Sequence, residues 1–361
     1  MKRLRDLGVT PGRLPAGPNN AITDVPGVRV GHTTLVAGEG KLVEGQGPVR
    51  TGVTAVLPHT GNIFREKVAA AVHSINGFGK VMGFEQVRER GTLETPVILT
   101  SNLSVARAGD ALMSYMLRQN PDIALTTGTV NCVVGECNDA WLNDARGRHI
   151  QPEHVWNAIE SASDGPVAEG CVGGGTGTTC YQFKGGIGTA SRRVLDGAFT
   201  VGALVQTNMG RRPELMVLGV PVGQRLMDEY LPETPPGSIM IVLATDAPFT
   251  PSQLERLAKR ATFGLARTGS ISSDQSGDFV IAFSTSNRQM HYPDEVIQVA
   301  PRFVDDGRSI DEFFLAVVES VEEAILNSLV AATTMTGRDN RTVHALPHDR
   351  LLDLLREYRP G

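Results

Sequence analysis

A near-continuous apolar run at 238–248, SIMIVLATDAP, constrains the fold more than any other segment. A strand that is apolar on both faces is usually covered on both sides of its sheet. The nine residues before Gly237, 228–236, contain three prolines in a short polar span, DEYLPETPP, which predicts an exposed loop. We therefore expect a buried central strand that begins at Ser238, with further layers on both faces of its sheet.

The rest of the chain alternates between strand and helix patterns. Short apolar or alternating runs predict strands at 19–36 (two strands around a Pro26-Gly27 turn), 52–57, 97–100, 199–208, 214–223 and 278–286. Helical spacing and start signals predict helices at 104–119, 152–162, 250–267 and 310–335. Because neither a repeat nor a long linker divides the chain, we expect one α/β domain over residues 1–361, with helices on both sides of layered sheets.

Composition and charge narrow the classes of function. Hydrophobic residues make up 41% and charged residues 20% of the chain, which predicts a packed fold. The net charge of −5, with both signs interspersed, provides no basic stripe for nucleic acid and no polybasic arm for a membrane. No apolar run reaches the roughly 18 residues of a membrane span, and the basic start is not followed by a signal-peptide run, so we expect a cytoplasmic protein.

The patterns typical of metal and nucleotide sites are missing from the sequence. The eight histidines form no HExxH motif, and the four cysteines lack CxxC spacing. We therefore expect no metal, no cofactor and buried free thiols. The glycine-rich stretch at 169–180, EGCVGGGTGTTC, lacks the lysine of a phosphate-binding loop. Its glycines more plausibly allow the backbone to approach a cleft closely.

Ser238 has an unusual place for an ordinary core residue, because it opens a buried strand directly behind a glycine. The carbonyl carbon of Gly237 has no side chain beside it and is open to attack by the neighbouring hydroxyl. Cleavage of the Gly237-Ser238 bond would give the serine a free α-amine with a pKa of about 8, which can accept the proton of its own hydroxyl. Local sequence alone favours the simpler interpretation, a turn into a strand.

Six long motifs occur in order along the chain: RDLGVTPGRLPAGPNNAITDVPGVRVGHTTL, VNCVVGECNDAWLNDARGRH, EGCVGGGTGTTCYQFKGGIGTASRR, VQTNMGRR, GSIMIVLATDAP and SGDFVIAFSTSN. Together they resemble the DmpA-like aminopeptidases, also called L-aminopeptidase/D-esterases, a family that includes the β-peptidyl aminopeptidases. The resemblance extends over essentially the full length. It implies a layered αββα sandwich of the amino-terminal-nucleophile type. It also implies a precursor that is cut into residues 1–237 and 238–361, which stay associated, and a tetramer of such processed pairs.

The same resemblance implies a serine aminopeptidase or amidase that removes amino-terminal residues from peptides, amino-acid amides or esters, with Ser238 as nucleophile. It places Asn208 near the oxyanion, where a side-chain N–H stabilises developing negative charge. It also places Ser276 and Asp278 in contact with the nucleophile. The two lie two positions apart at the mouth of a predicted strand, so in an extended backbone they share a face and can orient Ser238. The family often has a glutamate where this chain has the shorter Asp278. Local sequence alone favours turn-forming roles for Asn208, Ser276 and Asp278.

Two further residues are implied to contact the substrate. Glu136 matches an acid that faces the free ammonium group of the substrate, a charge-assisted contact suited to an aminopeptidase. Without the resemblance, an acid in such a loop is more often solvated. Trp141 stands where relatives can carry a tyrosine near the active site; its indole donates through nitrogen but offers no hydroxyl.

Two other functions stay open from the sequence. The first is an unprocessed relative that folds without cleavage and acts as a binding or scaffold protein. The second is a self-cleaving acyltransferase that resembles the ornithine acetyltransferases. Those enzymes typically cut before a threonine, so Ser238 argues against the second alternative.

Overall fold

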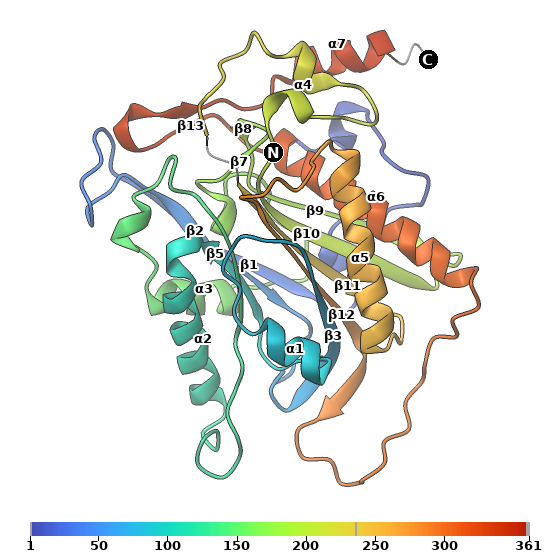
Figure 1. Ribbon diagram of the computed structural model, residues 1–361. Helices are drawn as coiled ribbons and strands as arrows, with labels where there is room; N and C mark the ends of the chain where they lie inside the picture. The colour runs from blue at the N-terminus through green and yellow to red at the C-terminus, as the bar shows by residue number, and fades with distance from the viewer. Residues whose placement is uncertain (1, 235–236, 359–361) are drawn as a thin grey trace.

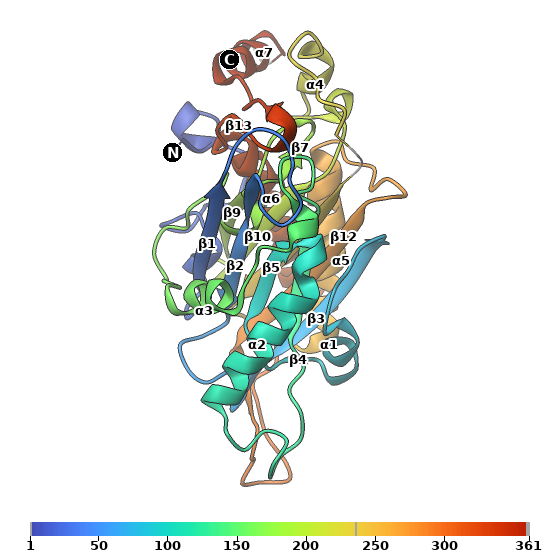
Figure 2. The same cartoon turned by 90° about the vertical axis from the view of Figure 1, so that its left-hand side faces the viewer.

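The computed structural model describes residues 2–234 and 237–358, which form four layers (Figure 1). Two β-sheets pack face to face, with a pair of helices on each outer side. The four helices are α2 (Val105–Gln119), α3 (Pro152–Glu160), α5 (Pro251–Arg267) and α6 (Ser309–Val330). Figure 2 shows α2 and α3 across the outer face of the first sheet, whereas α5 and α6 cover the second. The expected αββα sandwich is confirmed.

The first sheet has four strands in the order β1-β2-β5-β6. They are β1 (Arg29–Ala37), β2 (Val49–Leu57), β5 (Val97–Ser101) and β6 (Val133–Cys137). β1 and β5 both pair antiparallel with β2, whereas β5 and β6 are parallel and are connected through α2. The carboxyl ends of β5 and β6 therefore meet at one edge of the sheet, where ligand sites commonly form.

The second sheet has six strands in the order β4-β3-β12-β11-β10-β9. They are β3 (Glu66–Gly77), β4 (Thr92–Leu93), β9 (Ile187–Val194), β10 (Phe199–Asn208), β11 (Ser238–Thr245) and β12 (Gly277–Met290). β11 is central: it runs parallel to β12 and antiparallel to β10. The remaining pairs in this sheet are antiparallel.

Shorter elements complete the described chain. They are the helices α1 (Phe84–Arg90), α4 (Val222–Arg225) and α7 (His348–Tyr358), and two hairpins, β7 (Thr179–Cys180) with β8 (Phe183–Lys184) and β13 (Met335–Thr336) with β14 (Thr342–Val343). Single 3-10 turns occupy Arg5–Leu7, Ile22–Asp24, Asn102–Ser104, Ala145–Gly147, Gly173–Gly175, Arg212–Glu214 and Arg338–Asn340. No helix among the described residues is both long and apolar enough to cross a membrane.

The apolar strand β11 is buried along its whole length, as the sequence predicts. Its odd-numbered residues from Ile239 to Leu243 join the core under α5 and α6. Its even-numbered residues from Met240 to Ala244 join the core between the two sheets. Burial of each large aliphatic side chain contributes roughly 1.5–3 kcal/mol. Because β11 buries such side chains on both faces, its central position in the fold is favoured. By the same alternation, Ser238 belongs to the side between the sheets.

The predicted start of α5 is confirmed. Thr250 precedes Pro251 and accepts a hydrogen bond from the Gln253 backbone N–H at 3.4 Å, while Gln253 Oε1 accepts one from the Thr250 N–H at 3.1 Å. These reciprocal bonds satisfy two backbone donors that the helix itself leaves free. The last long helix ends at Val330, five residues before the predicted Met335, and β13 begins at Met335.

Two predicted strands are wrong. Residues 214–223 do not form an extended strand: between Arg212–Glu214 and α4 they make a single bridge from Val217 to Val220. Leu215, Val217, Val220 and Val222 are buried in the core under α5 and α6. A short apolar run therefore indicates burial without fixing the backbone conformation. The first half of 19–36 is also not a strand. Asp24 accepts hydrogen bonds from two nearby backbone N–H groups, which favours a 3-10 turn over a sheet ladder.

The loop predicted at 228–236 is irregular up to residue 234, and its last two residues lie outside the described residues. Ahead of them, the carbonyl of Pro232 accepts a hydrogen bond from Gln182 Nε2 at 2.8 Å. This contact ties the loop to the turn between β7 and β8.

The contact between β9 and α6 supplies a test of the packing. An ideal Cβ at Gly188 would lie 1.9 Å from the Ala324 carbonyl oxygen and 2.7 Å from the Ser328 nitrogen, both in the backbone of α6. We expect Gly188→Ala to lower the free energy of unfolding by about 1–3 kcal/mol, because the helix must move away from the sheet. Urea unfolding measures this change. Gly128→Ala is the control: no atom lies within 4 Å of its ideal Cβ, and an equal loss there would contradict the packing argument.

Candidate active site

A cleft of about 540 Å³ opens where the two sheets meet, at the carboxyl ends of β5 and β6 and the start of β11. It is lined by Gly77, Phe78, Gly79, Lys80, Asn102, Glu136, Asn138, Ser238 and Gln275. These residues come from both sheets and from the segments that follow β3, β5 and β6. Two of the residues expected at the site from the sequence, Ser238 and Glu136, therefore share one cavity.

Ser238 is the first residue of β11 and only 6% of its surface is exposed. Its hydroxyl oxygen accepts a hydrogen bond from the Gly277 backbone N–H at 3.2 Å. In the antiparallel ladder Ser238 lies directly opposite Asn208, the last residue of β10. The nucleophile predicted from the sequence is thus held at the end of two adjacent strands, with its side chain at the cleft wall.

The Asn208 side chain has a defined orientation. Its Oδ1 accepts hydrogen bonds from the Thr179 backbone N–H at 3.0 Å and from the Thr179 hydroxyl at 3.4 Å. The Nδ2 donors then lie on the side of Gly237, where an ideal Cβ would be 2.5 Å from Asn208 Nδ2 and 1.5 Å from the Asn208 carbonyl oxygen. Only glycine fits at position 237, and an amide donor lies next to the Gly237-Ser238 peptide.

Ser276 and Asp278 contact each other, as their spacing predicts, with 2.6 Å between Ser276 Oγ and Asp278 Oδ1. The Ser276 hydroxyl also contacts the carbonyl oxygen of Gly237. At the predicted cleavage site, Ser276 therefore contacts the Gly237 carbonyl. The Ser238 hydroxyl is instead hydrogen-bonded to the Gly277 backbone N–H. The polar chain therefore runs from Asp278 through Ser276 to the Gly237 carbonyl.

The hydrogen-bonded series from Asp278 through Ser276 to the Gly237 carbonyl has too few protons if Asp278 is ionised. The Ser276 hydroxyl has one proton but faces two acceptors, the Gly237 carbonyl and the Asp278 carboxylate. A protonated Asp278 donates to Ser276 and frees the Ser276 proton for the carbonyl. Burial raises the pKa of Asp278, against hydrogen bonds from Ser272 and Ser276 that lower it. Burial therefore favours the arrangement in which Ser276 polarises the Gly237 carbonyl.

Three residues that the sequence did not single out support this arrangement. The Ser272 hydroxyl contacts the second oxygen of Asp278, and the Gly277 backbone N–H holds Ser238. Asn76 Nδ2 lies 2.5 Å from the Ser276 carbonyl oxygen and 3.0 Å from the carbonyl oxygens of residues 273 and 274, which fixes the loop before β12. Asn76 lies near the end of β3, so no local pattern indicates its contact with residues about 200 positions away.

Glu136 is buried at the cleft wall, with only 4% of its surface exposed. Its Oε1 accepts a hydrogen bond from the Lys80 backbone N–H at 3.0 Å, while Oε2 is buried without a partner among the described residues. Burial raises the pKa of Glu136 to about 7, although the Lys80 N–H and the Lys80 charge oppose that rise. An acceptor oxygen without a partner, in a cavity that also holds Ser238, is suited to bind a cation.

Trp141 does not line this cleft. Its ring lies under the Arg341 guanidinium, 4.2 Å from the ring centroid, and its indole nitrogen is buried without a partner in the described part of the chain. The predicted place of Trp141 beside the substrate stays a prediction. The glycine turn at 173–175 also lies away from the cleft lining. The hydroxyls of Thr34 and Thr54 hold its backbone N–H groups against the first sheet.

Among the described residues no group of three or more histidine, cysteine or acidic side chains could hold a metal ion. The cysteines are unpaired: Cys132, Cys137 and Cys180 are buried, whereas Cys171 is partly exposed, contrary to the expectation that all are buried. Cys137 Sγ lies 3.2 Å from the Gln206 carbonyl oxygen and 3.5 Å from that of Ser238. This thiol packs β6 against β10 and against β11 at Ser238.

The four-layer fold, with a serine at the first position of a central strand, defines the class of amino-terminal-nucleophile hydrolases. The chain matches peptidase family S58 over residues 20–343. It is 45% identical to the β-peptidyl aminopeptidase BapA of Sphingosinicella microcystinivorans, over 99% of this chain and 92% of that relative. Because the match covers most of the chain, the protein belongs to peptidase family S58.

Solved structures agree with this assignment. The PH0078 protein of Pyrococcus horikoshii OT3 superposes with a TM-score of 0.94 at 51% identity, and 99% of each chain is covered. The L-aminopeptidase D-Ala-esterase/amidase of Ochrobactrum anthropi, described as a prototype of the serine aminopeptidases, superposes with a TM-score of 0.92 at 40% identity over 99% of each chain. The protein is accordingly a hydrolase of the aminopeptidase class with an amino-terminal-nucleophile fold.

The buried carboxyl of Glu136 makes the stability of the fold depend on pH. Its pKa is about 7 in the folded chain and 4.5 ordinarily, so between these values the folded state holds a proton that the unfolded state has lost. Stability should therefore fall as pH rises from about 4.5 to 7, by about 3 kcal/mol in total relative to Glu136→Gln. Urea unfolding at several pH values measures this difference.

The control for this titration is Asp274→Asn, which removes a charge from an exposed residue near the cleft. Its stability should follow the wild-type curve across the same pH range. Parallel pH curves for wild type and Glu136→Gln would show that Glu136 titrates in the folded chain as it does in water.

Proposed function

We propose that this protein cleaves its own Gly237-Ser238 bond. The mature enzyme then uses Ser238 to remove amino-terminal residues from small peptides, amino-acid amides or esters. One observation supports this most directly: the Gly237 carbonyl lies against the Ser276 hydroxyl and next to the Asn208 amide, immediately before the serine that opens β11. A carbonyl that already has a hydrogen-bond donor is prepared to carry negative charge.

Self-cleavage is an N-to-O acyl shift followed by hydrolysis. The Ser238 hydroxyl oxygen attacks the Gly237 carbonyl carbon; the new C–O bond forms, the C–N bond breaks, and the hydroxyl proton passes to the Ser238 nitrogen. Water then hydrolyses the ester. The products are a carboxylate on Gly237 and a serine with a free hydroxyl and a free α-amine. Ser276 stabilises the oxyanion on Gly237 in this first reaction.

In the mature enzyme the Ser238 amine, with a pKa of about 8, accepts the proton as the hydroxyl attacks the substrate carbonyl. The same amine then protonates the leaving amine or alcohol, and an acyl ester remains on Ser238. Asn208 Nδ2 donates to the oxyanion, because Thr179 occupies its Oδ1. Water attacks the ester while the amine accepts its proton. The bond between the acyl carbon and the serine oxygen then breaks, the amine returns the proton to that oxygen, and the acid leaves a regenerated Ser238.

Glu136 is the group that selects a substrate with a free amine. An ammonium ion near its unpartnered Oε2 lowers the pKa of the carboxyl and restores its charge, so binding an ammonium offsets the cost of burying Glu136. Peptides, amino-acid amides and amino-acid esters all carry this ammonium. The names of two relatives, a β-peptidyl aminopeptidase and an L-aminopeptidase D-Ala-esterase/amidase, support this range of substrates.

The pieces 1–237 and 238–361 remain one folded unit in this proposal. β11 pairs on one side with β10, from the first piece, and on the other with β12, from the second. Separating the pieces would expose the apolar faces of a central strand to water. We propose that processed pairs assemble into a homotetramer, as the family resemblance implies, and that the protein is cytoplasmic, as the sequence pattern predicts.

The cleavage site is tested by amino-terminal sequencing of the purified protein. We expect a second amino terminus that reads Ser-Ile-Met-Ile-Val, because the bond before Ser238 is the one that breaks. Ser238→Ala lacks the attacking hydroxyl and should remain a single 38.6 kDa chain on denaturing electrophoresis. Ser161→Ala, at an exposed serine, should cleave normally. Fully active enzyme with an unbroken backbone through Ser238 would refute the proposal and favour a different nucleophile.

The proton balance around Asp278 is tested by the rate of self-cleavage after cell-free synthesis. Asparagine at this position mimics a protonated carboxyl, since its N–H can donate to Ser276, so Asp278→Asn should cleave at a rate near that of the wild type. Asp278→Ala should cleave more slowly. Ser276→Ala should be slower by about 100-fold, as for the loss of one oxyanion donor. If Asp278→Asn is as slow as Asp278→Ala, an ionised carboxylate is required instead.

A further inference from the structure

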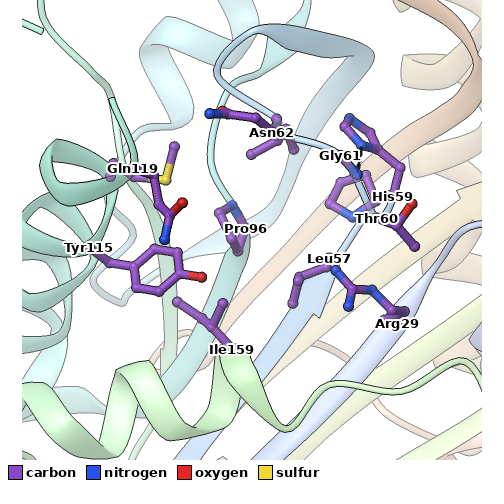
Figure 3. Close-up of a pocket in the computed structure, with 13 residues that line it drawn as sticks. Arg29, Leu57, His59, Thr60, Gly61, Asn62, Pro96, Tyr115, Gln119 and Ile159 are labelled. Carbon is purple, nitrogen blue, oxygen red and sulfur yellow. Dashed lines mark hydrogen bonds between the residues drawn. The ribbon is translucent and has the colours of Figure 1, made fainter. Parts of the chain in front are cut away.

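A second cavity, of about 190 Å³, lies at the opposite end of the first sheet from the catalytic cleft. Figure 3 shows it between the start of β1, the end of β2 and the start of β5, with α2 and α3 along one side. Pro96 lines this cavity just before β5, whereas Asn102 lines the catalytic cleft just after it. The full length of β5 therefore separates the two sites.

Arg29 is the charged side chain of this cavity. Its lining residues include no acid and no lysine. The Arg29 side chain is partly exposed, but its Nε is buried without a hydrogen-bond partner among the described residues. A buried guanidinium N–H without a partner loses its hydration without compensation. The empty space beside Arg29 is thus the natural place for an anion.

The other polar groups of the cavity are neutral. The Tyr115 hydroxyl and the Gln119 amide point into the space from α2, across from Arg29 (Figure 3). His59 is held in one neutral form: its Nδ1 accepts from the Gly61 N–H at 3.0 Å, so its Nε2 donates to the Glu66 carbonyl at 2.8 Å. Burial lowers the pKa of His59, in agreement with that form. One cation and neutral donors favour a ligand with one negative charge.

The remaining wall is apolar and is formed by Leu57, Pro96, Met116 and Ile159. A cavity on the order of 150 Å³ with apolar walls holds a benzene ring, so this one has room for a ring or a short branched chain. A carboxylate on such a ligand can form charge-assisted hydrogen bonds with the Arg29 guanidinium. Because no acid lines the cavity, the ammonium group of an amino acid would have no anionic partner.

We propose that this second cavity binds a small monocarboxylate with an apolar body, a ligand class that lacks the ammonium required at the catalytic cleft. The ligand places its carboxylate on Arg29, with the Tyr115 hydroxyl and the Gln119 amide as further donors. Its apolar part lies against Pro96 and Ile159. This site does not depend on the proposed aminopeptidase chemistry.

The test measures binding of 4-fluorobenzoate by fluorine NMR, with 4-fluorobenzamide as the uncharged isostere. The carboxylate should bind at one site per chain, and the amide should bind at least about tenfold more weakly, because it lacks the charge that Arg29 recognises. 4-Fluorophenylglycine, which adds an ammonium group, should also bind more weakly. Ser238→Ala should bind 4-fluorobenzoate as the wild type does, whether or not the chain is cleaved.

Variants separate the cavity from general surface charge. Arg29→Gln should raise the dissociation constant about tenfold or more, whereas Arg107→Gln should leave it unchanged. Arg107 is a matched control because it lies on the same helix, α2, but is exposed and contacts the Arg148 carbonyl, outside the cavity lining. Tyr115→Phe keeps the packing and should weaken binding by a smaller factor, which tests the site even if Arg29→Gln folds poorly.

Three results would overturn the proposal. The first is equal binding by Arg29→Gln and wild type at matched thermal stability. The second is loss of binding in Ser238→Ala, which would place the ligand in the catalytic cleft. The third is no detectable binding of 4-fluorobenzoate by the wild type.

Discussion

The arrangement of the active site depends on one strand pairing, the antiparallel register of β10 against β11. This register sets Asn208 opposite Ser238 at the point where both strands end at the cleft. A slip of one residue would turn each side chain to the other face of the sheet, because strand side chains alternate with a period of two. The alternating apolar residues of β11 oppose such a slip, since both cores would then have to be repacked. Core packing thereby fixes the relative position of the nucleophile and the amide donor.

The second requirement is the close approach of the two sheets. An ideal Cβ at Gly135 in β6 would lie 2.3 Å from the terminal methyl carbon of Met240, so glycine allows this edge strand to pack directly over β11. The approach brings the neighbouring Glu136 to the wall of the cavity that Ser238 lines. It also removes water from the carboxyl, which raises its pKa to about 7. In the proposed function, packing and substrate selection are therefore linked, because the burial that shapes the cleft also raises the pKa of the carboxyl proposed to bind the ammonium.

The sequence predicts the layers, β11 and the start of α5 because apolar periodicity and helix caps are local signals. It also predicts the contact between Ser276 and Asp278, which lie two positions apart where β12 begins. The strand predicted at 214–223 is wrong because a buried run need not be extended. The roles of Asn76 and Ser272 could not be predicted, because each depends on a contact across a loop or between distant strands. The predictions for Asn208 and Glu136 depend on the family resemblance, because the local sequence alone favours a turn-forming Asn208 and a solvated Glu136.

In the proposed mechanism, the hydrogen-bonded series of Asp278, Ser276 and the Gly237 carbonyl has one role before self-cleavage and another after it. In the precursor a neutral Asp278 serves best, because Ser276 must direct its proton to the scissile carbonyl. Cleavage converts an uncharged peptide into an α-amine on Ser238 and a carboxylate on Gly237. A protonated amine close to Asp278 lowers the pKa of that acid, whereas burial raises it. In the proposed mechanism, cleavage therefore shifts the pKa of Asp278 in the direction opposite to burial. A short aspartate, held by two serine hydroxyls, suits both states without a change of fold.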